Sequence, residues 1–381
     1  MIKKFTNQEV NFGADCSSDY LKKRVSELAV RKILYVTGKD SFQQSGAMDF
    51  LRIHAMLKIE HRFSEFRANP NYNDLMNGLE YFQKVRPDCI LAVGGGSVLD
   101  MAKLINFFGT TKIDPEGYLD GWWRPKTPFM MKLLPCIAIP TTAGSGSETT
   151  QFSVLYKNKI KHSVEHPAMI PDTVILNPEL TTNMTPYLTA CTGMDALSQG
   201  VESYWAVGAT NESRIYAGKA IRLATAFLER AVKKPDAKSR KSMQEAAFWA
   251  GRAINISKTT ICHALSYSIT SHFGYPHGHA VGLLLPAVFE FHLKMGIVTT
   301  GLIDCFDCGN HKNIPAFLRN LTESIGIICL KTFLVKDIEL IASEVNIERI
   351  GNNPVTLSPA DLCELLIKAM AMSPSAPPRL V

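Results

Sequence analysis

Four of the chain's ten histidines lie within one short apolar stretch, from Thr259 to Pro286. They are His263, His272, His277 and His279. Neutral imidazole is the commonest protein ligand for metals, and burying several imidazoles without partners is unfavourable. The stretch therefore suggests a metal site, although any one of these histidines taken alone is better explained as a satisfied core or surface residue.

A second chemical stretch lies upstream, from Thr192 to Trp205, and its pattern predicts a helix. Asp195 and Gln199 are four residues apart in it, so their side chains share one helix face. Together with His263 and His277 they would supply two oxygen and two imidazole ligands. Such a set suits a divalent ion that leaves room for a substrate oxygen.

Two loops have the composition of nucleotide-binding turns. Gly94, Gly95, Gly96 and Ser97 follow the apolar run Cys89–Val93 and precede a helical pattern. Glycines let the backbone approach a phosphate, and a helix start favours negative charge, but a tight turn without a ligand has the same pattern. The hydroxyl-rich run from Pro140 to Glu148 could bind a ribose or nicotinamide, or could cap a helix.

Together these motifs resemble the iron-containing (group III) alcohol dehydrogenases over nearly the whole chain. The usual metal ligands of that family are one aspartate and three histidines. Asp195, His263 and His277 match this pattern, and Gln199 stands where the family usually has histidine. Because a neutral amide oxygen binds divalent ions more weakly than imidazole, the resemblance leaves iron, zinc and manganese open as the metal.

The resemblance also implies NAD or NADP as cofactor. The implied contacts, besides the four loop residues Gly94 to Ser97, are Asp100, Thr141, Thr142, Ser145 and Lys161. NAD-preferring members often place an aspartate after the first strand, where this chain has Gly38 followed by Lys39. A missing carboxylate and a nearby cation would accept a 2′-phosphate, so NADP fits this position as well as NAD does. The alternative is that Lys39 is simply a solvated loop residue.

The runs D-A-L-S-Q, A-I-N-I-S-K, C-H-A-L-S-Y and S-H-F-G-Y-P-H-G-H-A resemble a subgroup that contains phosphonoacetaldehyde reductases. This implies reduction of phosphonoacetaldehyde to 2-hydroxyethylphosphonate. A dianionic substrate needs cations and hydrogen-bond donors, for which Lys258, Asn255 and His279 are the candidates. Each also has a purely structural explanation at a helix end or behind the metal. Tyr267 stands where many relatives carry a histidine, and could relay a proton or serve only in packing.

The elements that must position these residues differ between the two halves. Short apolar runs at Lys32–Gly38, Lys58–Phe63, Cys89–Val93, Leu134–Ile139 and Thr173–Leu176 alternate with helical patterns, which predicts a parallel sheet covered on both faces. From Pro186 onward the pattern is helical. We therefore predict an α/β dinucleotide-binding domain (residues 1–182) and an all-helical metal-binding domain (residues 183–381), dehydroquinate synthase-like in fold by resemblance, with the catalytic cleft between them.

Composition and net charge limit the classes of partner that this chain could bind. The 381 residues are 46% hydrophobic and 20% charged, with a net charge of +6 and no Lys/Arg run interleaved with aromatics, so we expect no nucleic-acid partner. No leader-like or membrane-length apolar segment is seen, which predicts a cytoplasmic protein without membrane contact. Seven of the nine cysteines are scattered singly in mostly apolar settings, which fits this compartment. Cys305 and Cys308, with His311 nearby, form only a weak metal or redox pattern.

The sequence thus predicts an enzyme acting on a small aldehyde or alcohol; the resemblance implies a phosphonate as substrate and a homodimer or larger assembly. Three alternatives stay open. They are a general primary-alcohol dehydrogenase, a lyase resembling 3-dehydroquinate synthase, and a non-catalytic protein that lost its metal together with the histidine at position 199.

Overall fold

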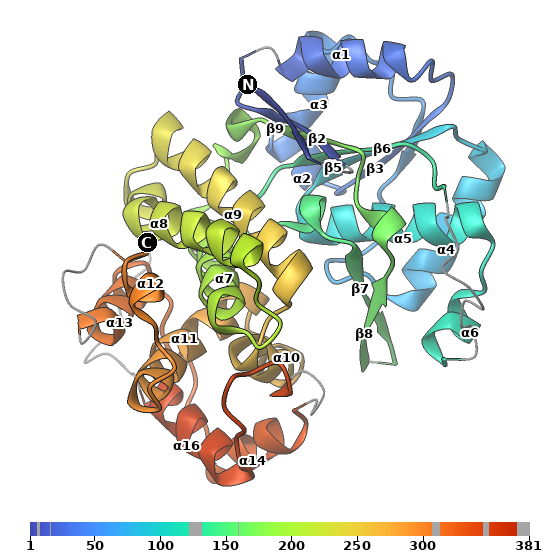
Figure 1. The fold of residues 1–381 in the computed structure, drawn as a ribbon. Helices are drawn as coiled ribbons and strands as arrows, with labels where there is room; N and C mark the ends of the chain where they lie inside the picture. Colours follow the sequence, from blue (N-terminus) through green and yellow to red (C-terminus); the bar gives the residue numbers. More distant parts are fainter. Residues whose placement is uncertain are drawn as a thin grey trace. The chain divides into compact units, whose positions relative to one another are not determined.

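The computed structural model describes residues 1–5, 8–15, 17–121, 132–158, 160–306, 313–345 and 350–371 (Figure 1). The chain divides into two compact units. Unit 1 comprises Met1–Thr142 and Gly146–Met184, and unit 2 comprises Ala143–Ser145 and Thr185–Val381.

Unit 1 is built on a seven-stranded sheet with the order β1-β2-β9-β6-β5-β3-β4. Every neighbouring pair is parallel except β1 and β2, which are antiparallel. The strands are β1 (Ile2–Phe5), β2 (Gln8–Phe12), β3 (Ile33–Thr37), β4 (His61–Phe63), β5 (Cys89–Gly94), β6 (Cys136–Pro140) and β9 (Thr173–Leu176). A separate hairpin is formed by β7 (Phe152–Lys157) and β8 (Ile160–Glu165).

Helices cover both faces of this sheet, as Figure 1 shows with α1 and α3 on one side and α4 and α5 on the other. Their bounds are α1 (Ser17–Glu27), α2 (Ser41–Gln44), α3 (Ala47–Asp49), α4 (Tyr72–Val85), α5 (Gly96–Thr111) and α6 (Pro115–Leu119), with a π-helical turn η1 at Phe50–His54. Strands β5, β6 and β9 are buried throughout, as expected for central strands of a covered parallel sheet. The predicted parallel α/β architecture is therefore confirmed.

Two pairs of strands were not predicted. The first is the N-terminal hairpin of β1 and β2, and the second is the hairpin of β7 and β8. Their sequences, such as IKKF and IKHSVE, are mixed in polarity and only partly buried. Strands of this kind lack the continuous apolar run by which the central strands were recognised.

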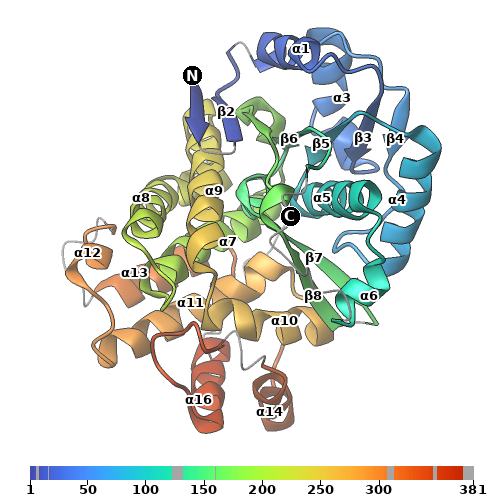
Figure 2. The same cartoon turned by 45° about the vertical axis from the view of Figure 1, so that its right-hand side comes forward.

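Among its described residues, unit 2 is helical. Its main helices are α7 (Pro186–Trp205), α8 (Asn211–Lys233), α9 (Ala237–Ser257), α10 (Ile261–Phe273) and α11 (His277–Lys294), followed by α12 (Thr300–Ile303), α13 (Ile314–Ser324), α14 (Val335–Ser343) and α16 (Pro359–Met370). Helix α7 packs against α8, α9 and α11, and a second view places it among these helices (Figure 2). From Thr189 to Trp205 it is buried except at Thr192 and Tyr204, so α7 is the central helix of the unit.

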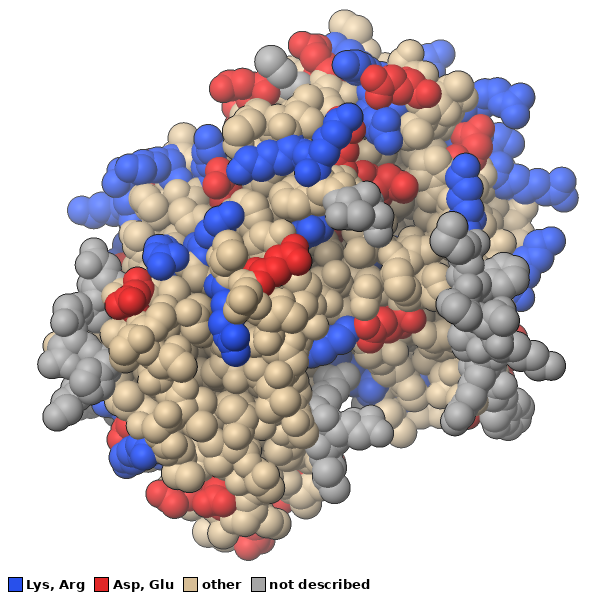
Figure 3. Space-filling view, viewed as in Figure 1, with Lys and Arg blue, Asp and Glu red and all other residues tan. Residues whose placement is uncertain are grey.

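Charges of both signs are interspersed on the face of the molecule drawn in Figure 3, beside a wide uncharged area. Across the described residues, no helix combines the length and apolar character needed to cross a bilayer.

Candidate active site

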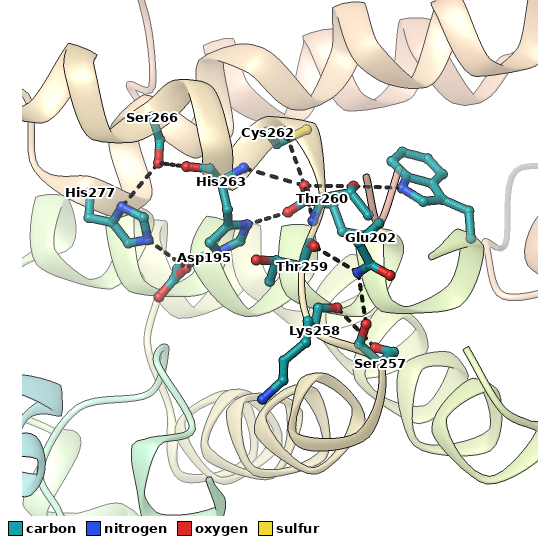
Figure 4. A network of polar contacts seen from close by, with 12 residues as sticks. Asp195, Glu202, Ser257, Lys258, Thr259, Thr260, Cys262, His263, Ser266 and His277 are labelled. Atoms are coloured by element: carbon teal, nitrogen blue, oxygen red, sulfur yellow. Dashed lines mark hydrogen bonds and ion pairs between the residues drawn. The ribbon is translucent and has the colours of Figure 1, made fainter. Parts of the chain in front are cut away.

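Three side chains of types that can bind a metal ion converge from three helices of unit 2 (Figure 4). Asp195 comes from α7, His263 from α10 and His277 from the start of α11. The Asp195 Oδ1 atom lies 3.3 Å from His263 Nε2 and 3.8 Å from His277 Nε2. One ligand atom from each residue lies within 4.8 Å of the other two, which is close enough for a single ion to contact all three.

Gln199 joins this cluster from the next turn of α7. Its side chain is 4% exposed and is one of the groups that lower the pKa of the Asp195 carboxyl. The Oε1 atom has no hydrogen-bond partner among the described residues. A buried polar atom left unpaired costs about 1–3 kcal/mol, and a cation held by the other three side chains would remove that cost. The four residues therefore fit a divalent metal.

Ser266 fixes which nitrogen of His277 is available. Its Oγ donates to the backbone oxygen of His263 at 2.8 Å, which uses its single proton. The same Oγ lies 3.2 Å from His277 Nδ1, and so it accepts the Nδ1 proton there. In a neutral His277 this bond leaves the lone pair on Nε2, which lies 3.8 Å from Asp195 Oδ1, and that is the tautomer that a metal-binding imidazole needs.

Charges within the cluster perturb one another. Burial alone would raise the pKa of Asp195, but the hydrogen bond from His263 and the neighbouring His277 lower it. Burial alone would lower the pKa of His263, yet the Glu202 and Asp195 carboxylates raise it to about 10. Asp195 is therefore held as a carboxylate, which is the form that binds cations.

A glycine allows the two ligand-bearing helices to meet. A Cβ atom on Gly278 would lie 1.9 Å from the backbone oxygen of Cys191 in α7. No side chain could be accommodated at that distance, because the obstacle is backbone. The close approach sets His277, the preceding residue, beside the ligands of α7.

Tyr267 lies next to the cluster, one helical turn beyond His263. Its ring stacks on that of His277, with ring centroids 5.7 Å apart and planes at 4°. The side chain is half-buried. Tyr267 therefore covers one face of the His277 imidazole.

His279 does not reach the position expected of a substrate contact. It is completely buried; its Nδ1 lies 2.8 Å from the Tyr187 hydroxyl and its Nε2 lies 2.8 Å from the backbone oxygen of Ile328. Both ring nitrogens are thus engaged by the protein. The expectation that His279 contacts an anionic substrate does not fit the structure, which gives it a packing and bonding role behind α7.

Lys258 stands out by its backbone. It follows α9 with φ 62° and ψ −178°, a region that is essentially restricted to glycine. The Asn352 amide holds this bend by donating to the backbone oxygens of Ser257 at 2.8 Å and Thr259 at 2.9 Å. In Figure 4 the Lys258 side chain extends away from the network around Glu202. Asn255 lies in the last turn of α9 and is half-buried.

The glycine-rich loop joins β5 to α5, as predicted. Gly94 is the last residue of β5, and Gly96 is the first of α5. The Ser97 hydroxyl accepts a hydrogen bond from the backbone N–H of Asn69 at 3.1 Å. The Thr141 amide donates to the Gly94 oxygen at 3.0 Å and so joins the loop that follows β6. The two predicted nucleotide loops therefore meet at the carboxyl ends of neighbouring strands, where such sheets bind nucleotides.

Within the second loop, Thr141 is buried, Thr142 lies against Gly95, and Ser145 falls in the short segment that groups with unit 2. Asp100 does not present a free carboxylate to a cofactor. Its Oδ1 accepts from the Ser147 hydroxyl at 2.5 Å and its Oδ2 accepts from the Val154 amide at 3.0 Å. Asp100 therefore holds the following segment in place, and direct contact with a cofactor does not fit its bonding.

Two cationic side chains surround the position of the missing aspartate. Gly38 follows β3, and Lys39 pairs with Glu65 at 3.3 Å. Arg62 of β4 donates from Nε to the Thr37 hydroxyl at 2.7 Å and from Nη2 to the Gly38 and Lys39 oxygens at 2.8 Å each. Lys161 lies in β8 of the small hairpin.

Sequence reasoning missed Arg62, Glu202 and Ser266. The spacing gave a signal for two of them, because Glu202 follows Asp195 by seven residues and Ser266 follows His263 by three, so each shares a helix face with a ligand. Cys305 is buried and donates to the Gly301 oxygen at 3.2 Å. Cys308 and His311, which would complete the C-x-x-C pattern, lie outside the described residues.

Comparison with known proteins agrees with this geometry. Residues 7–178 match the family described as iron-containing alcohol dehydrogenase, and residues 189–370 match the Fe-containing alcohol dehydrogenase family, C-terminal. The chain is 34% identical over 235 residues to a 1-propanol dehydrogenase of Citrobacter freundii, covering 61% of this chain and 59% of that protein. It is 35% identical over 250 residues to the phosphonoacetaldehyde reductase of Streptomyces viridochromogenes, covering 64% and 61%.

Among solved structures, the chain resembles the sulfoacetaldehyde reductase of Bifidobacterium kashiwanohense in complex with NAD+. The identity is 27% and the TM-score 0.85, covering 97% of this chain and 99% of that one. The two curated relatives are thus matched over about three fifths of their length, whereas the fold is matched throughout. The two family matches cover both units, and the chain therefore belongs to the iron-containing alcohol dehydrogenase family.

Proposed function

We propose that the protein is a metal-dependent alcohol dehydrogenase, or aldehyde reductase, that transfers hydride between NAD(P)H and a small aldehyde. The observation that carries this is the convergence of Asp195, His263 and His277, with Gln199 beside them, in a chain that belongs to the iron-containing alcohol dehydrogenases. When bound there, a divalent ion such as iron, zinc or manganese supplies Lewis acidity to the substrate oxygen.

The chain's own residues hold and orient this site. Asp195, Gln199, His263 and His277 are the proposed ligands, and Ser266 fixes the His277 tautomer. Tyr267, stacked on His277, excludes water from one side of the ligands and carries a hydroxyl that can donate a proton to a product alkoxide.

For the cofactor, we propose that the loops at Gly94–Ser97 and Thr141–Ser145 bind the dinucleotide and that NADP is preferred. Gly38 leaves no carboxylate to repel a 2′-phosphate, and Lys39 and Arg62 place two cations at the same turn. Lys161 is a further proposed contact.

For the substrate, we propose phosphonoacetaldehyde, with 2-hydroxyethylphosphonate as product. Two relatives support an anionic aldehyde, since one is named a phosphonoacetaldehyde reductase and another a sulfoacetaldehyde reductase. The strained backbone of Lys258 also supports it, because strain of this kind is concentrated at functional sites. Lys258, with Asn255, is the proposed partner of the phosphonate.

The test is oxidation of NADPH and NADH by metal-reconstituted protein, with phosphonoacetaldehyde and with propanal. Lys258→Ala should raise KM for phosphonoacetaldehyde by about tenfold or more, the loss expected for one charge-assisted hydrogen bond, and leave propanal unchanged. Lys294→Ala, which removes an exposed lysine paired with Glu290, is the matched control.

Equal use of both aldehydes by the wild-type protein, with no effect of Lys258→Ala, would reduce the proposal to a general primary-alcohol dehydrogenase. No net consumption of NADPH or NADH with any aldehyde would refute the dehydrogenase. Metal analysis of the purified protein would then address the non-catalytic alternative, which binds no metal, whereas the lyase uses a metal and returns its cofactor unchanged in a closed redox cycle.

A further inference from the structure

Glu202 is a fully buried carboxylate in α7, one turn beyond Gln199 and two beyond Asp195. The spacing of four and three residues puts all three side chains on one face of the helix. Buried carboxylates are rare unless they are fully bonded. Glu202 therefore needs partners, and the structure supplies them from the start of α10 (Figure 4).

One oxygen of Glu202 closes the first turn of α10. Its Oε1 accepts from the backbone amides of Thr260 at 3.1 Å, Cys262 at 2.9 Å and His263 at 3.3 Å, and from the Thr260 hydroxyl at 2.9 Å. Thr260, the N-cap residue, makes no capping bond with its own side chain. A carboxylate from another helix thus replaces the usual cap, and its charge also suits the positive end of the helix.

The second oxygen bonds a metal ligand. Glu202 Oε2 is hydrogen-bonded to His263 Nδ1, while His263 Nε2 faces Asp195. Since a carboxylate can only accept, Nδ1 must carry the proton. The two nitrogens of His263 are therefore assigned, with Nδ1 as donor to Glu202 and Nε2 toward the cluster.

We propose that Glu202 is a positioning residue of the metal centre, which locks both the ring orientation and the tautomer of His263 while it fixes the helix end that carries this histidine. The proposal rests on the metal site proposed above, but not on the identity of the substrate. Partners of this kind around ligand histidines typically change metal affinity by about 10–100-fold when removed.

Glu202→Gln is a sharp test because it keeps the shape of the side chain and replaces the acceptor oxygen that faces His263 Nδ1 with a hydrogen-bond donor. The amide oxygen can still accept from the first turn of α10, and this places the NH2 group against His263 Nδ1. Two donors cannot face each other, so Nδ1 must give up its proton, and the neutral imidazole then carries its one proton on Nε2. A protonated Nε2 cannot bind a metal ion.

The measurement is the Kd for Co2+ by competition with a chromophoric chelator, together with the visible spectrum of the Co2+ protein. Glu202→Gln should raise the Kd by about 10–100-fold. Glu290→Gln, which removes another bonded helical glutamate of unit 2, should lower stability without changing the Kd. Circular dichroism of the metal-free proteins establishes that each variant is folded.

A wild-type Kd and spectrum in folded Glu202→Gln would overturn the proposal and leave Glu202 as a helix cap only. If Glu202→Gln does not fold, nitrogen-15 NMR of histidine-labelled wild-type protein with Zn2+ decides. A protonated Nδ1 and metal-bound Nε2 on His263, identified by its loss in His263→Asn, would support the proposal; a deprotonated Nδ1 would overturn it. Failure of the wild-type protein to bind Co2+ would overturn the metal site itself.

Discussion

The backbone conformation of Lys258 leads to a prediction that distinguishes the effect of backbone strain on stability from the effect of the amine charge on substrate preference. At φ 62° and ψ −178°, a side chain costs about 1–3 kcal/mol, whereas glycine adopts this conformation freely. Glycine gains more entropy than alanine on unfolding, which offsets about 0.5–1 kcal/mol. Lys258→Gly should therefore be more stable than Lys258→Ala by about 1 kcal/mol.

Thermal and urea unfolding of the two variants, both metal-free, provide the assay. For a cooperative unit of this size the difference corresponds to about 2–4 °C in Tm. Neither variant has the amine, so both should lose the preference for phosphonoacetaldehyde equally. The two variants would then differ in the free energy of unfolding but not in substrate preference, as expected if the bend serves to present the Lys258 amine.

Asn352 supplies an internal control, because its amide holds the oxygens on either side of the bend. When Asn352→Ala is added to both variants the bend can relax. The difference in the free energy of unfolding between Lys258→Gly and Lys258→Ala should then shrink. Equal stability of the two variants in the wild-type background, or a more stable alanine variant, would refute the reasoning, because alanine is the better residue at an unstrained helix end.

Three further predictions concern other parts of the chain. Gly38→Asp should weaken NADPH binding relative to NADH by about tenfold or more, because a carboxylate would repel the 2′-phosphate; fluorescence titration measures both, and an unchanged ratio would contradict the proposed NADP preference. Gln199→His should tighten Zn2+ binding by about tenfold, measured by chelator competition, since imidazole is the stronger ligand; no change would mean that residue 199 does not touch the ion. Burial would raise the pKa of Glu290, but Lys368, Arg319 and Lys294 lower it to about 2. Its stabilising effect is therefore complete above about pH 5 and is lost as the pH falls toward 2, so Glu290→Gln should cost about 1–2 kcal/mol at pH 7 and progressively less in acid, as urea unfolding at each pH would show.

The sequence predicted the parallel sheet and the helical second half because each rests on a local pattern. It predicted the pairing of Asp195 with Gln199 for the same reason, since a four-residue spacing fixes relative direction on a helix. The convergence of His263 and His277 on Asp195 depends on how three helices pack. Residue types alone could only suggest it, and the resemblance to a family supplied the pattern of ligands that supports it.

The two positions that do not fit, His279 and Asp100, show why residue type and proximity in sequence are insufficient. His279 is two residues beyond His277 on α11, and a helix turns by about 200° over two residues, so the two rings point in nearly opposite directions. Asp100 lies one turn into α5, where its carboxylate meets Ser147 and Val154 from a later segment. Glu202 shares a helix face with Asp195, but its role was missed because its partners are mostly backbone amides, which residue types do not reveal.

Lys103 has a practical use as an internal reporter. Its side chain is 1% exposed, and its amine donates to the backbone oxygens of Ser147, Thr150 and Phe152 at 3.0, 3.2 and 2.5 Å. Amine-reactive reagents cannot reach it while α5 and this segment stay together. Acetylation of Lys103, followed by mass spectrometry beside that of exposed lysines such as Lys23, would therefore record how often unit 1 opens, without any change to the sequence.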